Sequence, residues 1–370
     1  MRHAHPRYGR RTDREPDVLE LRVHGVNNTA PPAVLDLPAA DVEQVAGDSL
    51  GSFWRPTDAA MARTAPGSRG HVPQGVVREA YSWGGLARTS VGGRGAAGTA
   101  ISAASRIGWA LLVPFGLVNL AFWSRRLAGG RSWADGWQDD ASAALIRVFS
   151  LGLTLLLLGT TSAVSLDLVV GQCFGGSTRW CPRLPPLLDG LARLGPGDRL
   201  VVGTLAPVAV LVLLAALAGA SRSRYEQLAA LPVAYGVRAA PDDAPALATP
   251  GFWSNARLTA LLGRLHLAAG LCFLVVLTAL PQVLGAVSPV FVGTLALAAA
   301  GLLAIAGWLA SRRCAVAALP GTAGGRLLVR RVTWVTSASA LLFLAHLLLL
   351  LRTDGVLTRA AGLDVAPTVL

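Results

Sequence analysis

Ser82 lies in a pattern that is typical of a serine nucleophile. The segment from Gly75 to Gly85, GVVREAYSWGG, predicts a strand that ends at this serine. A nucleophile on a sharp turn after a strand follows the pattern G-x-S-x-G, because only small residues fit on either side of the serine. Ala80 and Gly84 occupy those two places. A serine so placed would attack an acyl carbonyl and would need a histidine base.

An upstream motif would complete such a site. The alternating residues Val18 to Val23 predict a short strand that leads into His24 and Gly25, and a helix is expected from Pro31 with Thr29 or Ala30 as its cap. A strand followed by His-Gly resembles the start of the oxyanion loop in α/β-hydrolases, where backbone N–H groups face the developing negative charge. The donors here would be the N–H groups of Val26 and Trp83.

Three features favour a turn serine over a nucleophile. The elbow should begin a helix, but the first half of Leu86 to Ala104 is rich in glycine. Between the two strands only Asp41 to Arg55 is a weak candidate for further regular structure. The acid and the histidine should follow the serine, yet the later histidines, His266 and His346, both lie in apolar runs. We therefore expect no intact triad, and a hydrolase would need its base from His71, His266 or a partner chain.

The composition indicates a membrane protein. The chain has 370 residues, of which 53% are hydrophobic and 15% charged, with a mean hydropathy of +0.51. These values are too apolar for an ordinary soluble protein of this length. The net charge of +12 comes from arginine, since the sequence contains no lysine. The arginines are spread between the apolar runs, so we expect anionic lipid headgroups rather than nucleic acid as the partner.

The chain contains six apolar stretches that are candidates for membrane spans. They are Ile107 to Trp123, Val148 to Val170, Leu200 to Ala220, Leu265 to Leu284, Pro289 to Ala310 and Val332 to Leu351. A helix needs about 20 apolar residues to cross a hydrocarbon core of about 30 Å. The first, third and fifth connections carry four, five and five arginines, the second carries four, and the fourth carries none. The positive-inside rule places the odd-numbered connections in the cytoplasm.

The first apolar stretch is the weakest candidate. It is short, and it holds Pro114 and Asn119 in its interior. Because proline breaks a helix and asparagine is costly in lipid, we expect this segment to be re-entrant or interfacial. Five full spans then follow, with the N-terminus inside and the C-terminus outside. The alternative is six spans with an exported N-terminus.

The loop after the second stretch contains a pair of cysteines. Cys173 and Cys181 enclose CFGGSTRWC, and the favoured topology places them on the oxidising side of the membrane. We therefore predict a structural disulfide between them. Cys272, within a span, and Cys314, on the cytoplasmic side, are expected to be unpaired.

The predicted organisation is an α-helical polytopic membrane protein with a small N-terminal α/β segment in the cytoplasm. Residues 1–17 form a disordered basic N-terminus, and residues 18–105 form the hydrolase-like segment and its linker. Residues 106–352 form the transmembrane helical domain, and residues 353–370 form a tail. Residues 1–17 lack the apolar core of a secretory signal, which favours a cytoplasmic N-terminus.

Four segments together resemble a known group of proteins. RVHGV, the following Pro-Pro, YSWGGL and LLVPFGLVNLAFW are similar to segments of actinobacterial multi-pass integral membrane proteins of uncharacterised function. The similarity covers most of the chain and is strongest over residues 20–125. It implies a location in the bacterial plasma membrane and a layout, rather than a reaction. Members of that group continue beyond this point, so we expect a truncated product or a short relative.

Three functions are compatible with the sequence. The first is a non-catalytic membrane protein with a structural, assembly or interaction role, in which the hydrolase-like segment is degenerate. The second is a membrane-tethered serine hydrolase that uses Ser82 on lipid or acyl-ester substrates, and the third is a transporter. Gly93, Gly95 and Gly98 match a dinucleotide fingerprint by letter only, because no strand precedes them directly. We expect no cofactor and no metal site; a homo-oligomer or a membrane protein partner is plausible from the small residues in the spans.

Overall fold

The structure is a computed structural model of the whole chain. It describes residues 18–24, 29–47, 52–73, 76–82, 96–124, 141–174, 190, 193–234, 256–285, 288–311 and 323–352. The chain divides into two compact units. The first contains Met1–Ser132 and Tyr225–Ser254, and the second contains Trp133–Arg224 and Asn255–Leu370.

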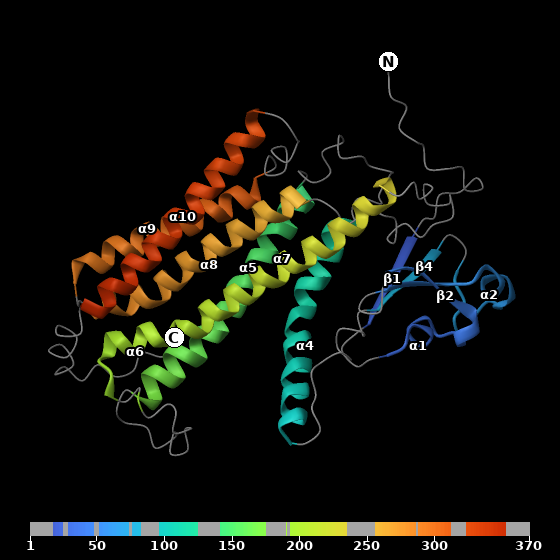
Figure 1. The fold of residues 1–370 in the computed structure, drawn as a ribbon, viewed down its shortest axis with the longest axis horizontal. Coiled ribbons are helices and arrows are strands. Elements are labelled where there is room, and N and C mark those ends of the chain that lie inside the picture. Colours follow the sequence, from blue (N-terminus) through green and yellow to red (C-terminus); the bar gives the residue numbers. More distant parts are fainter. Residues whose placement is uncertain are drawn as a thin grey trace. The chain divides into compact units, whose positions relative to one another are not determined.

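The first unit contains a four-stranded mixed sheet (Figure 1). Its strands are β1 (Val18–His24), β2 (Val42–Gly47), β3 (Ser52–Pro56) and β4 (Val76–Ser82), in the order β1-β4-β3-β2. β1 and β4 are parallel, whereas β3 is antiparallel to both β4 and β2. The two predicted strands at Val18 and Gly75 are confirmed. The weak candidate between them forms the antiparallel pair β2 and β3.

Short helices accompany the sheet. The helix α1 (Pro31–Leu35) has Ala30 as its N-cap and proline in its first turn, as the sequence predicts. A 3₁₀ turn, η1 (Ala39–Asp41), precedes β2, and α2 (Asp58–Arg63) follows β3. Thr57 caps α2 by accepting a hydrogen bond from the Ala60 N–H. Leu35, Val42 and Ala80 form the small apolar core between α1 and the sheet.

The predicted break at Pro114 is wrong. A single helix, α4 (Ala96–Ser124), runs through this proline for 29 residues. A proline removes only one backbone hydrogen bond, and in apolar surroundings a continuous helix satisfies the remaining N–H and C=O groups within the segment. The apolar part of α4, Ala110–Phe122, is shorter than the five candidate spans. Whether α4 crosses the membrane stays a prediction.

Five helical segments are long and apolar enough to span a membrane, among the residues that the structure describes. The first joins α5 (Ala141–Ser162) to a π-helical segment, η5 (Ala163–Cys173). The second begins with α6 (Pro196–Gly203) and continues, after a turn at Thr204, into α7 (Leu205–Ala234). The remaining three are α8 (Ala256–Leu284), α9 (Pro289–Ala310) and α10 (Ala323–Arg352). The chain is therefore a multi-pass membrane protein with a small sheet-containing N-terminal region.

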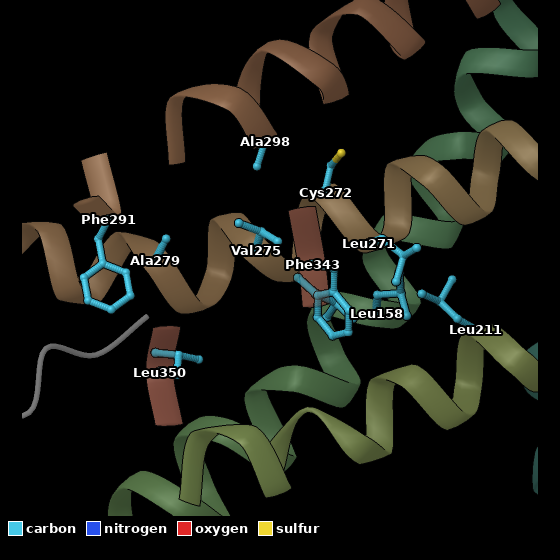
Figure 2. Packing of buried hydrophobic residues seen from close by; sticks show 11 residues of the cluster. Leu158, Leu211, Leu271, Cys272, Val275, Ala279, Phe291, Ala298, Phe343 and Leu350 are labelled. Atoms are coloured by element: carbon cyan, nitrogen blue, oxygen red, sulfur yellow. The ribbon is translucent and has the colours of Figure 1, made fainter. Parts of the chain in front are cut away.

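The second unit has a continuous apolar core around α8. Figure 2 shows Leu158 of α5, Leu211 of α7 and Leu271 of α8 close together, where the three helices meet. Phe291 of α9 and Leu350 of α10 are fully buried in the same cluster. Outward-facing leucines such as Leu303 and Leu341 remain 73% and 67% exposed. An apolar surface of this kind is suited to lipid contact.

Candidate functional site

The first candidate site lies at the C-terminal ends of β1 and β4. His24 and Ser82 are register partners on these parallel strands, and Ser52 of β3 is the register partner of Ser82 on its other side. Neighbouring strands are about 4.8 Å apart, so the backbones of these residues form one row across the sheet. The sheet thus joins the two strands that carry the predicted motifs. Gly25, Val26 and Trp83 lie outside the described residues, so their proposed oxyanion role stays a prediction.

Ser82 itself lacks the surroundings of an activated nucleophile. Only 4% of its surface is exposed. Within the described part of the chain, no hydrogen bond connects its hydroxyl to a histidine or a carboxylate. Glu79 lies three residues earlier on β4 and is buried, but alternate residues of a strand point to opposite faces. Glu79 and Ser82 therefore face opposite sides of the sheet.

The two candidate bases are engaged elsewhere. The Nδ1 atom of His71 lies 3.3 Å from the Thr64 carbonyl oxygen, and the His71 carbonyl accepts a hydrogen bond from Arg78. The Nδ1 atom of His266 lies 2.9 Å from the Thr154 hydroxyl on α5. His266 belongs to the second unit, whereas Ser82 belongs to the first. No histidine in the described ranges completes a triad with Ser82.

A charged cluster stabilises the β1–β4 pair nearer to the start of both strands. Glu20 accepts hydrogen bonds from Arg22 Nε at 2.7 Å and from Arg78 Nε at 2.6 Å. Partial burial raises the pKa of Glu20, but the hydrogen bonds and positive charges of Arg22 and Arg78 outweigh it and lower this pKa below its ordinary value. Arg78 also donates to the Gly70 and His71 carbonyls. The cluster therefore ties the loop before β4 to β1 and has a structural role.

Within the second unit, a buried arginine connects two spans. Arg147, near the start of α5, is only 2% exposed. Its Nε and Nη2 atoms donate hydrogen bonds of 2.9 Å to the carbonyl oxygens of Leu309 and Ser311 at the end of α9. Those carbonyls lack helical partners and carry the negative end of the helix dipole. The sequence places Arg147 in the first connection, directly before the apolar stretch that begins at Val148. A charge in this position was the one sign of a role inside the bundle.

Further polar contacts connect α8 to α10, and three of them along the helices show that α8 and α10 are parallel. Arg264 Nη1 donates to Thr333 Oγ1 at 3.1 Å, near the start of both helices. Cys272 Sγ lies 3.4 Å from Ser339 Oγ, and Thr278 Oγ1 lies 2.8 Å from His346 Nε2. The Thr278 hydroxyl donates to the Leu274 carbonyl at 2.8 Å and thus accepts from His346. His346 contacts Thr278 of α8, whereas His266 contacts Thr154 of α5, so the two histidines do not share a site.

The π-helical end of the first span contains an acidic residue, Asp167. Gln172 Nε2 donates to Asp167 Oδ2 at 3.3 Å. A spacing of five residues matches the i to i+5 repeat of a π-helix, so η5 brings these two side chains together. Cys173 is disulfide-bonded. Cys181 lies outside the described residues, and its pairing with Cys173 stays a prediction, while the buried Cys272 has a free thiol.

No group of three or more histidine, cysteine or acidic side chains is arranged to hold a metal ion in the described ranges. Comparison with protein-family models, with curated proteins and with solved structures finds no match. What the site can do must therefore be argued from its own geometry. The polar side chains in the spans form contacts between helices, and the serine with nucleophile-like spacing is buried.

Proposed function

We propose that this chain is a non-catalytic polytopic protein of the bacterial plasma membrane with a structural, assembly or interaction role. The observation that supports this most is the burial of Ser82, which is 4% exposed and has no histidine or carboxylate partner among the described residues. A hydrolase nucleophile must be reachable by its substrate and hydrogen-bonded to its base. The buried polar side chains of the spans support the same proposal, because they connect helices to one another.

The proposed orientation has the N-terminus and the arginine-rich connections in the cytoplasm. The Arg147 contact brings the start of α5 to the end of α9, and the Arg264 contact brings together the starts of α8 and α10. The His266–Thr154 contact adds α5 to the start of α8. The first, third and fifth connections therefore meet the bundle at one end, and the positive-inside rule assigns that end to the cytoplasm.

Cys314, in the fifth connection, tests this orientation. In a variant with serine at the other three cysteines, a membrane-impermeant maleimide should label Cys314 in inverted vesicles and not in intact spheroplasts. The opposite pattern would reverse the topology. Resistance of the full chain to extraction from vesicles at alkaline pH tests membrane integration itself.

A membrane-tethered serine hydrolase is the second candidate. The observation in its favour is the register of His24 with Ser82 on parallel strands, which places the two motifs at the same edge of the sheet. In this alternative the substrate would be a lipid or another acyl ester at the inner membrane surface. The base would have to come from a partner chain or from a position outside the described residues.

A fluorophosphonate serine probe separates the two candidates. We expect no labelling of the purified full-length protein in detergent. Ser82→Ala removes the candidate nucleophile, and Ser52→Ala is the matched control, because Ser52 is the register partner of Ser82 on β3. Labelling that persists in Ser52→Ala and vanishes in Ser82→Ala would overturn the non-catalytic proposal. Labelling lost in neither variant would indicate reaction at another serine and would also oppose it.

A further inference from the structure

An open hollow of about 290 Å³ lies on the outer face of α10 near its start. It is lined by Arg330, Thr333, Trp334 and Ser337. Residues three to four positions apart lie on the same face of a helix, so these four form one outward-facing strip. The lining combines a guanidinium, two hydroxyls and an indole that is 65% exposed. A small ligand with a negative charge beside an apolar part matches this chemistry.

A second guanidinium is hydrogen-bonded to one of the residues that line this hollow. Arg264 of α8 donates from Nη1 to the Oγ1 atom of Thr333, which in turn donates to the Val329 carbonyl at 2.9 Å. The Thr336 hydroxyl lies 3.3 Å from the Arg264 carbonyl oxygen and 2.9 Å from the Val332 carbonyl oxygen of its own helix, so it contacts the backbone of α8 at the same level. The Arg264 side chain is thus positioned beside the hollow before any ligand binds. Preorganised donors bind an anion at a lower entropic cost.

The positive charge of this strip has no counter-charge in α8, α9 or α10. α8, α9 and α10 contain no aspartate or glutamate. Salt bridges within the described ranges occur only in the N-terminal sheet region, and neither Arg264 nor Arg330 takes part in one. The 312–322 connection also lacks acidic residues. A counter-ion must therefore come from outside this part of the chain.

The depth of the hollow points to the lipid headgroups. The candidate span Gly324–Arg352 contains 29 residues, which corresponds to about 43 Å of helix against a hydrocarbon core of about 30 Å. The excess turns carry Arg326, Arg330 and Arg331 outside the hydrocarbon. Exposed tryptophan is enriched at the boundary between headgroups and acyl chains, where Trp334 would lie.

We propose that this hollow binds an anionic phospholipid, with Arg264 and Arg330 holding its phosphate and Trp334 contacting its glycerol and upper acyl chain. Guanidinium groups bind phosphate through paired, charge-assisted hydrogen bonds. Ser337 lies one turn deeper, within reach of the ester region. The inference rests on the proposed membrane location and names a specific lipid site within it.

The test uses purified, delipidated full-length protein in a non-ionic detergent. Phosphatidylglycerol and phosphatidylcholine with identical acyl chains are added separately, and bound lipid is measured by native mass spectrometry. We expect a preference for phosphatidylglycerol that falls roughly tenfold in the double variant Arg264→Gln/Arg330→Gln. The matched control, Arg331→Gln/Arg352→Gln, removes the same charge away from the hollow and should keep the preference. All four arginines are exposed, so we expect both variants to fold.

The outcomes separate this inference from the proposed function. An equal loss in both double variants, or no headgroup preference in the wild type, would overturn the lipid site and leave the membrane function intact. Displacement of the lipid by millimolar inorganic phosphate would assign the hollow to a soluble phosphate compound instead. Extraction of the chain from vesicles at alkaline pH would instead refute the membrane proposal itself. Arg330→Lys, which keeps the charge but not the paired donors, should retain part of the preference.

Discussion

Arg147 Nε donates a 2.9 Å hydrogen bond to the carbonyl oxygen of Leu309, across 162 positions of the chain. The contact places a buried positive charge at the carbonyl end of α9. It also fixes the start of α5 and the end of α9 at one end of the bundle.

Arg147→Met should destabilise the bundle by about 2–4 kcal/mol. The substitution keeps much of the side-chain volume but leaves the Leu309 and Ser311 carbonyls without this donor. Unfolding in detergent with increasing SDS measures the change. The control is Arg331→Met, an exposed arginine of α10, which should change stability by less than about 0.5 kcal/mol. Equal effects of the two substitutions would contradict the capping role of Arg147.

The Thr278–His346 contact should show strong coupling between its partners. Thr278→Val removes the acceptor of the His346 Nε2 hydrogen bond, while His346 is fully buried and its Nδ1 atom has no partner among the described residues. We expect the free energy of unfolding of this variant to fall by about 0.5–2 kcal/mol. In the His346→Leu background, Thr278→Val should cost much less. A double-mutant cycle by SDS unfolding measures the coupling, and additive effects would show that the contact contributes nothing.

Gly270 should not tolerate a methyl group. A Cβ atom at this position of α8 would lie 2.7 Å from Leu211 Cδ2 and 3.0 Å from Leu158 Cδ1. Both leucines are buried where α5, α7 and α8 meet, as Figure 2 shows, so they have little room to move. Gly270→Ala should lower the free energy of unfolding in detergent by about 1–3 kcal/mol, measured by thermal or SDS unfolding. Gly293→Ala on α9 is the control, because its Cβ would meet open space; a similar loss there would argue against close packing as the cause.

The Glu20 cluster should make the N-terminal sheet less stable in acid. Because Arg22 and Arg78 lower the pKa of Glu20 in the folded state, its contribution is present above the unfolded pKa of about 4.3 and is lost as the pH falls through the folded value. The cluster is partly exposed, so the effect should be below about 1 kcal/mol. Hydrogen exchange of β1 and β4, corrected for the intrinsic pH dependence, measures it.

Glu20→Gln should remove this acid-dependent loss of protection. Glu43→Gln is the matched control, because it removes a carboxylate on β2 that pairs with Arg55 on β3, away from the β1–β4 pair. Its β1 and β4 amides should retain the wild-type pH dependence. If Glu20→Gln left the profile unchanged, the cluster would not be its source.

Much of the layout could be predicted from local sequence. The strand at Val18, the helix start at Pro31 and the strand ending at Ser82 follow from alternation and capping, which depend on neighbouring residues. The apolar spans follow from length and hydropathy, because the bilayer sets both. The Pro114 prediction failed because the proline removes only one backbone hydrogen bond, whereas a continuous helix satisfies the other polar backbone groups of this apolar segment. The antiparallel β2 and β3 were only weakly visible because their stability depends on pairing.

The sequence by itself determined that this is a membrane protein, since hydrophobic content and span length are sums over residues and need no partners. It also determined the nucleophile-like spacing around Ser82. Only the tertiary structure decided that Ser82 is buried, that it is in register with His24, and that Arg147 caps α9. It likewise brought Arg264 of α8 to the hollow on α10. Burial and long-range hydrogen bonds arise from how distant segments pack, and local patterns do not contain that information.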